Sequence, residues 1–415
     1  MEQLKQRIEK HIETIATFTA TPGNGTTRLT YSKEDLQARH YIKEQMKASG
    51  LTVKEDGLGN IFGKLDGALA DAPSVMVGSH FDSVPNGGAY DGTAGVVAAL
   101  EVANLFYLAN IKPTYPLEII ALVEEEGARF GGGLMGSRGI TGELSEAEFS
   151  QLKDKNGVST KEAMQDIGLD PSLPKARDSK TMKAFLEMHI EQGPILEEKN
   201  IPIGVVASIV GQAEYYITIK GQAGHAGTTP MDKRSDALIT AAKIISELPE
   251  FAIAEGNGTV VTTGQLNVFP NGSNVIPDKV VFTVDIRSGK EKNVQHVIQL
   301  MKQCVALYQG NGIEIEVEET LYVKPKALSE KIQQLLKEHS SKCDIPYCSI
   351  DSGAGHDAMV FTDVTEVGML FIPSKAGLSH CPEEWSDAAD IANAVEILYQ
   401  TAKQLTEAGD MKEKL

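Results

Sequence analysis

Residues 78–84 are Gly78-Ser79-His80-Phe81-Asp82-Ser83-Val84, and the apolar run 75–77 leads into them. Residues 87–92 follow as Gly87-Gly88-Ala89-Tyr90-Asp91-Gly92, and a second apolar run, 119–123, leads into Glu124-Glu125-Glu126-Gly127. Both apolar runs have the composition of buried strands, so the imidazole and the carboxylates fall where strands give way to loops. Sites in α/β proteins are commonly built there. The pattern predicts an α/β fold with a polar site at the strand ends.

The segments around these motifs alternate between strand and helix. Strands are expected at 75–78, 117–123 and 184–189, and helices at 3–18, 33–48, 92–108, 328–339 and 387–405. The helical segments carry apolar residues at the spacing of helices that cover a sheet. This order favours one discontinuous α/β domain, residues 1–211 and 327–415, with a mixed sheet and flanking helices.

The middle of the chain has a different pattern. The expected order is strand 215–220, helix 235–248, strand 259–269, strand 279–287, helix 293–308 and strand 313–321. This βαββαβ order is typical of a ferredoxin-like unit. We therefore expect a smaller domain, residues 212–326, inserted into the larger one.

The segment 142–181 is polar and rich in Lys, Asp and Ser. We expect it to be a surface excursion with short helical pieces, and it carries no catalytic motif.

The net charge of the chain limits the kinds of partner that it is expected to bind. The 415 residues include 57 acidic and 39 basic side chains, a formal net charge of −18. Such a charge repels nucleic-acid phosphates and anionic lipid headgroups, so neither is expected as a partner. No apolar stretch approaches the roughly 18 residues that a membrane span requires. A small anionic substrate remains compatible with this charge if a local cation overrides the global field.

The cysteines Cys304, Cys343, Cys348 and Cys381 are widely spaced and form no C-x-x-C pair. The first five residues lack the basic-then-apolar order of a signal peptide. Both features lead us to expect a reducing, cytoplasmic location.

The motif residues are types that bind metal ions. His80 and Asp82 are two positions apart, so in an extended strand they point the same way, and Asp82 can orient a metal-binding imidazole. Asp91 precedes a helix, where its carboxylate could bridge two cations or cap the helix. Adjacent glutamates diverge at a strand end, so we assign Glu126 to metal binding and Glu125 to acid–base chemistry. An exposed acidic turn is the alternative.

Two further histidines complete the candidate set. His189 lies in an apolar strand flanked by acids, where a hydrogen-bonded core histidine is the alternative, and His380 lies in a turn. Three imidazoles and two carboxylates are the mix expected for two divalent ions such as zinc, manganese, cobalt or nickel. The run 131–136 matches G-x-G-x-x-G but begins well past the strand end, so we do not expect a dinucleotide site.

The inserted domain carries its own polar residues. Alternation places Phe282, Val284 and Ile286 on one face of the expected strand and Asp285 with Arg287 on the other. Arg287 is therefore either an ordinary surface arginine or a guanidinium placed to hold a substrate carboxylate.

Six motifs resemble those of the two-metal aminoacylase and carboxypeptidase group of amidohydrolases, and most closely its hydantoinase/carbamoylase branch. This branch contains N-carbamoyl-L-amino acid hydrolases, allantoate amidohydrolases and β-ureidopropionases. The motifs are Gly78-Ser79-His80-Phe81-Asp82-Ser83-Val84, Gly87-Gly88-Ala89-Tyr90-Asp91-Gly92, Glu125-Glu126-Gly127-Ala128-Arg129-Phe130, His189-Ile190-Glu191-Gln192-Gly193, Gly224-His225-Ala226-Gly227-Thr228-Thr229-Pro230-Met231 and Ser352-Gly353-Ala354-Gly355-His356-Asp357. The resemblance spans almost the whole chain.

The resemblance implies a role for each candidate. One metal would be held by His80 and His189, the other by Glu126 and His380, with Asp91 bridging and Glu125 as the proton shuttle. It further implies that the inserted domain forms a homodimer and acts as a lid, and that His225 reaches the partner subunit's site. Gln212, Asn274, Arg287 and Gly355 would line the substrate pocket.

The activity that the resemblance implies is hydrolysis of a linear ureido bond. Glu125 would take a proton from a water activated by the two ions and return it to the leaving nitrogen, with His225 stabilising the charge on the carbonyl oxygen. The expected substrate is an N-carbamoyl-L-amino acid, and the alternatives are allantoate and a dipeptide or N-acyl amino acid. From another class, a non-catalytic metal-binding dimer that recognises carboxylates is also an alternative.

Overall fold

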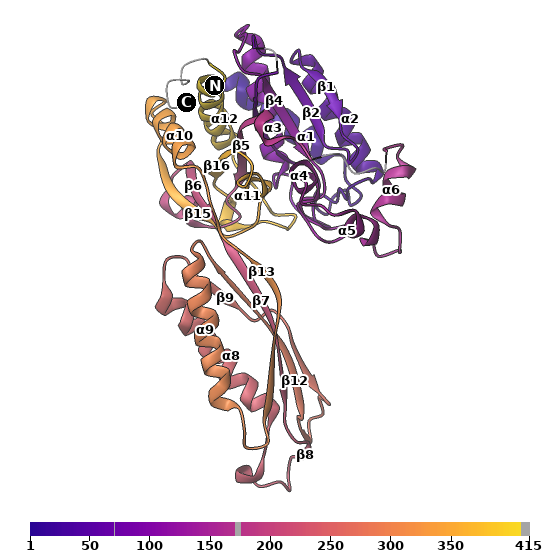
Figure 1. The fold of residues 1–415 in the computed structure, drawn as a ribbon, viewed down its shortest axis with the longest axis vertical. Coiled ribbons are helices and arrows are strands. Elements are labelled where there is room, and N and C mark those ends of the chain that lie inside the picture. The colour runs from indigo at the N-terminus through magenta and orange to yellow at the C-terminus, as the bar shows by residue number, and fades with distance from the viewer. Residues whose placement is uncertain (70, 171–175, 408–415) are drawn as a thin grey trace. The chain divides into compact units, whose positions relative to one another are not determined.

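The computed structural model describes residues 1–69, 71–170 and 176–407, which form two compact units (Figure 1). The larger unit contains Met1–Ala207, Leu328–Ile350 and the described residues from His356 onward. The smaller unit contains Ser208–Ala327 and Asp351–Gly355. Residues 351–355 were expected in the larger domain, but in the structure they belong to the smaller unit.

The larger unit is built around a mixed sheet. Its strands include β1 (Thr52–Glu55), β2 (Ile61–Leu65), β3 (Ser74–His80), β4 (Leu117–Leu122), β5 (Met182–Ile190), β6 (Ile203–Ile209) and β16 (Glu366–Ile372). They lie in the order β1-β2-β4-β3-β5-β16-β6. The run β4-β3-β5-β16 is parallel, and the flanking strands pair antiparallel. The short β14 (Lys326–Ala327) and β15 (Tyr347–Ser352) also pair with β6. The predicted mixed sheet is confirmed.

The central strands are covered on both faces. Every residue of β3 and β4 is buried, which explains why these strands appear in the sequence as continuous apolar runs. Parallel strands of this kind require helical crossovers, and α3 (Thr93–Leu108), which joins β3 to β4, is buried along most of its length. The strand ends that carry the polar motifs are therefore held by a rigid frame.

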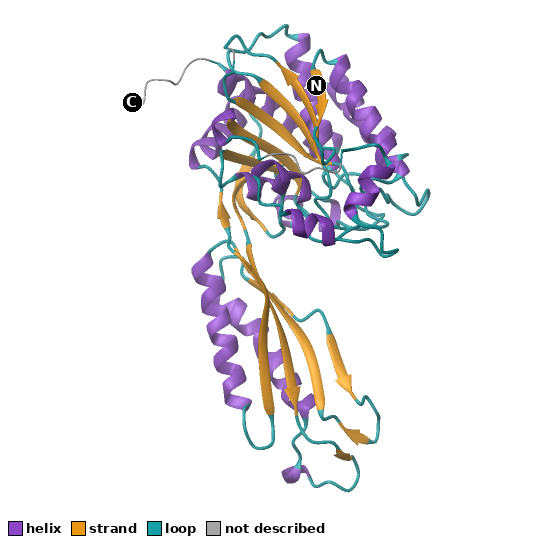
Figure 2. Cartoon of the chain, turned by 45° about the vertical axis from the view of Figure 1, so that its right-hand side comes forward, coloured by secondary structure: helices purple, strands orange, loops and turns teal. Residues whose placement is uncertain are grey.

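Helices flank this sheet (Figure 2). α1 (Glu2–Ala16), α3 and α12 (Ala388–Thr406) pack against one another, and α2 (Lys33–Ala48) packs against β1 and β2. α10 (Glu330–Lys342) and α11 (Asp357–Phe361) pack against β16, and α11 also contacts α4 (Met135–Thr141). Two further short helices are α7 (Ile195–Lys199) and η3 (Lys375–Gly377). None of the helices within the described ranges is long and apolar enough to cross a membrane.

The segment 142–181 is only partly a surface excursion. It forms α5 (Glu146–Gln151), α6 (Thr160–Asp166) and η1 (Ser179–Thr181), and residues 171–175 lie outside the described part. Phe149 and Met164 are buried in the core of the larger unit. The expectation of a plain surface segment was wrong for these two helices, because each is too short to show an apolar periodicity yet buries an apolar side chain.

The smaller unit has a five-stranded sheet backed by two helices, and a separate two-stranded sheet. Its strands are β7 (Gly211–Lys220), β9 (Val260–Thr262), β10 (Leu266–Phe269), β12 (Lys279–Ser288) and β13 (Glu314–Val323), in the order β10-β12-β7-β13 with β9 also on β12. The helices are α8 (Ala237–Glu255) and α9 (Glu291–Tyr308). The two-stranded sheet pairs β8 (Gly224–His225) with β11 (Val275–Ile276), and η2 (Met231–Lys233) is a short further helix. The expected strand 259–269 is divided in two around Gly264, because a glycine weakens a strand interior.

Candidate metal centre

Five side chains that the sequence assigned to metal binding lie together at one edge of the mixed sheet. His80 ends β3, and His189 lies next to the end of the parallel neighbour β5. Asp91 precedes α3, Glu126 follows β4 and His380 follows η3. Because the carboxyl ends of parallel strands share one edge, residues distant in the sequence converge there.

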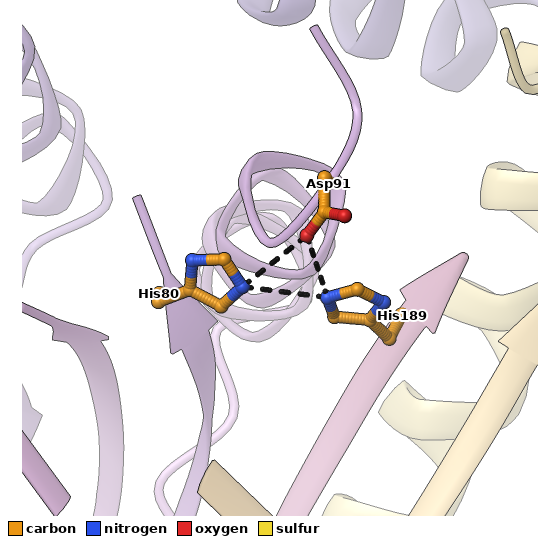
Figure 3. A group of neighbouring side chains, drawn as sticks. All are labelled: His80, Asp91 and His189. Atoms are coloured by element: carbon orange, nitrogen blue, oxygen red, sulfur yellow. Dashed lines mark hydrogen bonds and ion pairs between the residues drawn. The ribbon is translucent and has the colours of Figure 1, made fainter. Parts of the chain in front are cut away.

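His80, Asp91 and His189 form a first group of facing ligand atoms (Figure 3). Asp91 Oδ1 lies 3.4 Å from His80 Nε2 and 3.1 Å from His189 Nε2. All three residues are buried. The backbone of Gly92 passes so close to His80 that a Cβ there would collide with the imidazole ring, which accounts for the glycine after Asp91.

Asp91, Glu126 and His380 form a second group. His380 Nε2 lies 3.3 Å from Asp91 Oδ2 and 3.4 Å from Glu126 Oε2. The two oxygens of Asp91 therefore face different groups, which is the arrangement of a bridging carboxylate. The second group is less enclosed, because the His380 side chain is 49% exposed.

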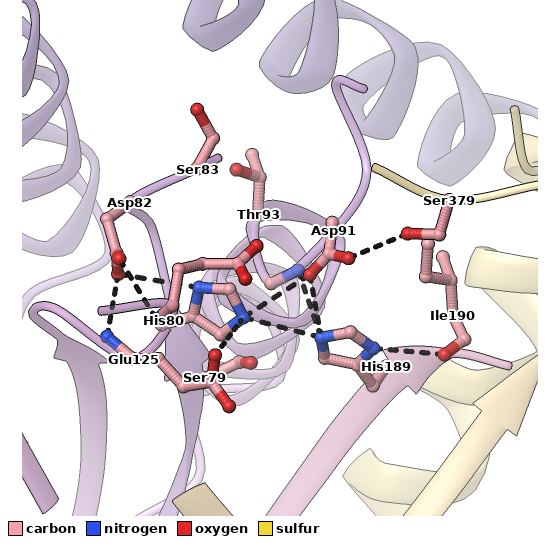
Figure 4. A network of polar contacts seen from close by, with 12 residues as sticks. Ser79, His80, Asp82, Ser83, Asp91, Thr93, Glu125, His189, Ile190 and Ser379 are labelled. Atoms are coloured by element: carbon pink, nitrogen blue, oxygen red, sulfur yellow. Dashed lines mark hydrogen bonds and ion pairs between the residues drawn. The ribbon is translucent and has the colours of Figure 1, made fainter. Parts of the chain in front are cut away.

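The imidazoles are oriented by groups behind them (Figure 4). Asp82 Oδ1 lies 3.5 Å from His80 Nδ1, and the Asp82 carboxylate also accepts the N–H groups of Glu125 and Glu126 at 3.1 and 3.2 Å. The Ile190 carbonyl oxygen is 3.0 Å from His189 Nδ1. Since a carbonyl only accepts, this nitrogen carries the proton, and His189 Nε2 presents a lone pair to the centre of the group.

The three glutamates after β4 point in different directions. Glu124 is buried with a left-handed backbone, and its Oε1 accepts the N–H groups of Arg129 and Phe130, at 3.3 and 2.9 Å. Glu125 Oε2 lies 3.8 Å from His80 Nε2, close to the first group but outside both groups. Burial raises the pKa of Glu125 well above its usual range. The divergence expected of adjacent glutamates is therefore present.

Several residues of this centre were not singled out from the sequence. Gln192 Nε2 and Ser379 Oγ lie 2.6 and 2.8 Å from Asp91 Oδ2, and donate hydrogen bonds to it. The ring of His356 is buried, with its centroid 4.5 Å from that of His189. Gln192 and His356 lie inside the motifs 189–193 and 352–357, so their place in these motifs could have identified them. Ser379 had none beyond its place beside His380.

The expected substrate residues Gln212 and Arg287 lie together in the smaller unit. They are cross-strand partners on β7 and β12, and both hydrogen bond Asp285. Arg287 Nε and Nη2 make a bidentate pair with this carboxylate at 2.9 and 3.1 Å, and Nη1 donates to the Gly353 carbonyl oxygen at 3.3 Å. Gly355 belongs to the same segment as Gly353, Asp351–Gly355.

His225 and Asn274 lie at the other end of the smaller unit. The N–H of Ala226 donates to the Asn274 carbonyl oxygen at 3.0 Å, and β8 lies beyond the Lys220 end of β7 (Figure 1). From Gln212 to Lys220, β7 advances by eight residues, about 27 Å at its rise per residue. The structure therefore does not bring His225 and Asn274 together with Arg287 within one chain.

The sequence profile of peptidase family M20/M25/M40 matches residues 76–404, a range that holds all five ligand candidates. The chain belongs to this peptidase family. As a member of family M20/M25/M40, it is similar along nearly its whole length to named amidohydrolases. It is 44% identical to an N-carbamoyl-L-amino-acid amidohydrolase of Paenarthrobacter aurescens, over 96% of this chain and 98% of that protein. It is 36% identical to an allantoate amidohydrolase of Bacillus subtilis strain 168, over 96% and 98%.

A solved structure supports the same placement within family M20/M25/M40. An amidase of the hydantoinase/carbamoylase family from Burkholderia multivorans aligns with a TM-score of 0.92 at 34% identity, covering 97% of this chain and 98% of that one. The resemblance drawn from the motifs is confirmed, as is the class of enzyme, an amidohydrolase.

The donor set of this M20-family chain fits divalent metal. Glu126 Oε1 is buried and finds no hydrogen-bond partner within the described ranges, although its other oxygen faces His380. Imidazole nitrogens and carboxylate oxygens are the ligands that zinc and manganese accept. Burial raises the pKa of Glu126 to about 7, because a negative charge on this enclosed carboxylate is costly without a cation beside it.

Proposed function

We propose that the protein hydrolyses N-carbamoyl-L-amino acids to the free L-amino acid, carbon dioxide and ammonia, with consumption of one water. The observation that carries this proposal is the pair of ligand groups sharing Asp91, with Glu125 beside them. The similarity to carbamoyl amino acid amidohydrolases over nearly the full length of both proteins supports the choice of substrate.

The metal ligands of the proposed enzyme are divided between two divalent ions. His80, Asp91 and His189 would hold one ion, and Asp91, Glu126 and His380 the other. Ions bound there would supply Lewis acidity to the substrate carbonyl and to water. Zinc, manganese, cobalt and nickel all accept this donor set.

Glu125 is the proposed general base and acid. Its side chain is 11% exposed, and its carboxylate lies at the border of the first group, where it can reach a water without being a ligand itself. Glu125 takes a proton from the attacking water and returns it to the leaving nitrogen, so its own protonation state is restored after each turnover. Asp82 holds the backbone of Glu125 and faces the far nitrogen of His80, and so positions both.

Arg287 is the proposed binding site for the substrate carboxylate. Asp285 holds one edge of its guanidinium in a fixed plane, and Gln212 donates to the same carboxylate at 2.7 Å. A guanidinium oriented in this way is suited to bidentate recognition of a second carboxylate. Gly355, in the segment next to Arg287, is proposed to line the same pocket.

A homodimer is the proposed active form. His225 and Asn274 are separated from Arg287 by most of the length of β7, a span too long for one small substrate, so we assign them to the site of the partner subunit. There, His225 would donate a hydrogen bond to the carbonyl oxygen as charge develops on it. The smaller unit also exposes large apolar side chains that suit an interface: Met231, Ile239, Ile253, Val260, Leu266, Phe269 and Leu307.

Allantoate is the second candidate substrate. It also combines a carboxylate with ureido groups and would use the same Arg287, and allantoate amidohydrolases are among the full-length relatives. Their identities of 36% and 35% are below the 44% of the first carbamoyl amino acid amidohydrolase, which favours the latter.

The test is a substrate panel given to metal-free protein reconstituted with manganese or zinc. N-Carbamoyl-L-methionine, allantoate and a set of dipeptides are compared by their kcat/KM values. We expect N-carbamoyl-L-methionine to lead by at least tenfold. A lead for allantoate or for a dipeptide would replace the proposed substrate, and no turnover of any of them would favour a non-catalytic binding protein.

A further inference from the structure

Glu384 accepts hydrogen bonds from the backbone of two proposed metal ligands, Asp91 and His380, which lie far apart in the chain. Its Oε1 accepts the N–H groups of Tyr90 and Asp91, at 2.9 and 3.0 Å. Its Oε2 accepts the Ser379 hydroxyl at 2.8 Å and the N–H of His380 at 3.3 Å. The Glu384 side chain is itself buried. One carboxylate thus fixes the two loops that carry Asp91 and His380.

The His380 loop depends on this fixation. His380 has a φ of 58°, a left-handed conformation that is costly for a residue with a side chain. Its Nε2 must nevertheless face Asp91 and Glu126 while half of its side chain is exposed to solvent. The hydrogen bond from the His380 N–H to Glu384 offsets part of this cost, because it holds the backbone of the strained residue itself.

The opposite loop is shaped to admit Glu384. A Cβ on Gly88 would collide with Glu384 Oε1 and with its Cβ and Cδ. On the next residue, Trp385 meets Tyr90 edge to face, with ring centroids 5.3 Å apart. Gly88 leaves room for the Glu384 side chain, and the Tyr90–Trp385 pair packs the same two loops together. Both loops therefore fix the position of Glu384.

We propose that Glu384 is a positioning residue that sets the affinity of the second metal group, Asp91, Glu126 and His380. This inference rests on the proposed pair of ions. The first group is expected to depend less on Glu384, because its two histidines are oriented independently, His80 by Asp82 and His189 by the Ile190 carbonyl. Loss of Glu384 should therefore lower the metal affinity of the second group more than that of the first.

The test compares Glu384→Gln with Glu383→Gln, its exposed neighbour, as a matched control. Metal-free proteins are titrated with manganese in a calorimeter, and bound metal is measured after gel filtration. We expect wild type and Glu383→Gln to bind two ions per subunit. In Glu384→Gln we expect one ion of nearly unchanged affinity and a second weakened by at least tenfold, since replacing a residue that orients a metal ligand typically costs about 10–100-fold in metal affinity.

A second readout distinguishes positioning from a general structural role. With N-carbamoyl-L-methionine as substrate, saturating manganese should restore most of the kcat of Glu384→Gln, while the manganese concentration for half activation rises at least tenfold. Gly88→Ala should reproduce the calorimetric result by displacing Glu384, and it decides the question if Glu384→Gln fails to fold. Two ions bound with wild-type affinity by a folded variant would overturn the inference. Fewer than two ions on the wild type would instead overturn the proposed function.

Discussion

The Nε2 atoms of His80 and His189 lie 3.4 Å apart although the residues are 109 positions apart in the chain. Their rings are stacked, with an interplanar angle of 28°, and both nitrogens face Asp91 Oδ1. These two ring nitrogens and the carboxylate oxygen converge on one point, and a cation bound there would be coordinated by all three. This relationship explains why buried polar groups are concentrated at the end of an apolar sheet.

Metal binding should stabilise the folded protein. Metal-free protein is expected to unfold at a lower temperature than protein with saturating manganese or zinc, because an ion that binds only the folded state adds about 2.7 kcal/mol at 100 times its Kd. Scanning calorimetry with and without metal measures the difference. Equal unfolding temperatures would argue against ligation by these five residues.

Glu125→Gln should abolish most turnover without loss of metal. Removal of a general base and acid lowers the rate by about 10²–10⁴-fold, and Glu125 lies outside both ligand groups. Turnover of N-carbamoyl-L-methionine and metal content after gel filtration are measured on the same preparation. Activity close to wild type would exclude Glu125 from proton transfer, and loss of bound metal would make it a ligand.

Arg287→Ala should raise the KM of substrates that carry a carboxylate much more than the KM of neutral analogues. We expect the KM for N-carbamoyl-L-methionine to rise by about 10–100-fold, the value of a hydrogen bond to a charged group, with a much smaller change for its neutral methionine amide analogue. Lys279→Ala, an exposed cation on the same strand, is the control. Equal effects of Arg287→Ala on both substrates would remove its proposed role.

The proposed role of His225 across the dimer predicts complementation. Neither Glu125→Gln nor His225→Ala should be active alone. Mixed subunits should recover up to about a quarter of wild-type activity, because a heterodimer contains one site with an intact Glu125 and a partner's intact His225. His296→Ala, an exposed histidine of the smaller unit, serves as the control for the histidine substitution. Mixtures that stay inactive would place His225 in the site of its own subunit.

Arg28 should be required for stability. Its buried guanidinium donates to the carbonyl oxygens of Phe81 and Ile15 at 2.6 and 3.0 Å, and to the hydroxyl of Thr93 at 2.8 Å. Arg28→Met leaves these acceptors buried without a donor, which should cost roughly 3 kcal/mol or more of unfolding free energy. Urea unfolding measures the change, with Lys180→Met, an exposed cation, as the control. A midpoint equal to wild type would show that water replaces the arginine.

Much of the fold was predictable because the decisive signals are local. Continuous apolar runs identified β3 and β4, and helical periodicity identified α1 and α12 within a few residues of their ends. Short elements were predicted less well. The helices that bury Phe149 and Met164 have too few residues to display a period. The break at Gly264 divides 259–269 into β9 and β10, which both pair with β12, and a single glycine does not reveal such a break in the sequence.

The sequence by itself determined the candidate metal ligands, since His80 and the glutamates after β4 follow apolar runs with the composition of buried strands, and Asp91 precedes a helix. Tertiary structure alone decided which atoms face each other: Asp91 divides its oxygens between His189 and His380, and Glu384 holds both loops. It also decided that His225 lies at the opposite end of its unit from Arg287. The physical reason is that strand composition reflects burial along the chain, whereas ligand geometry depends on loops brought together by a sheet whose order differs from the order of the sequence.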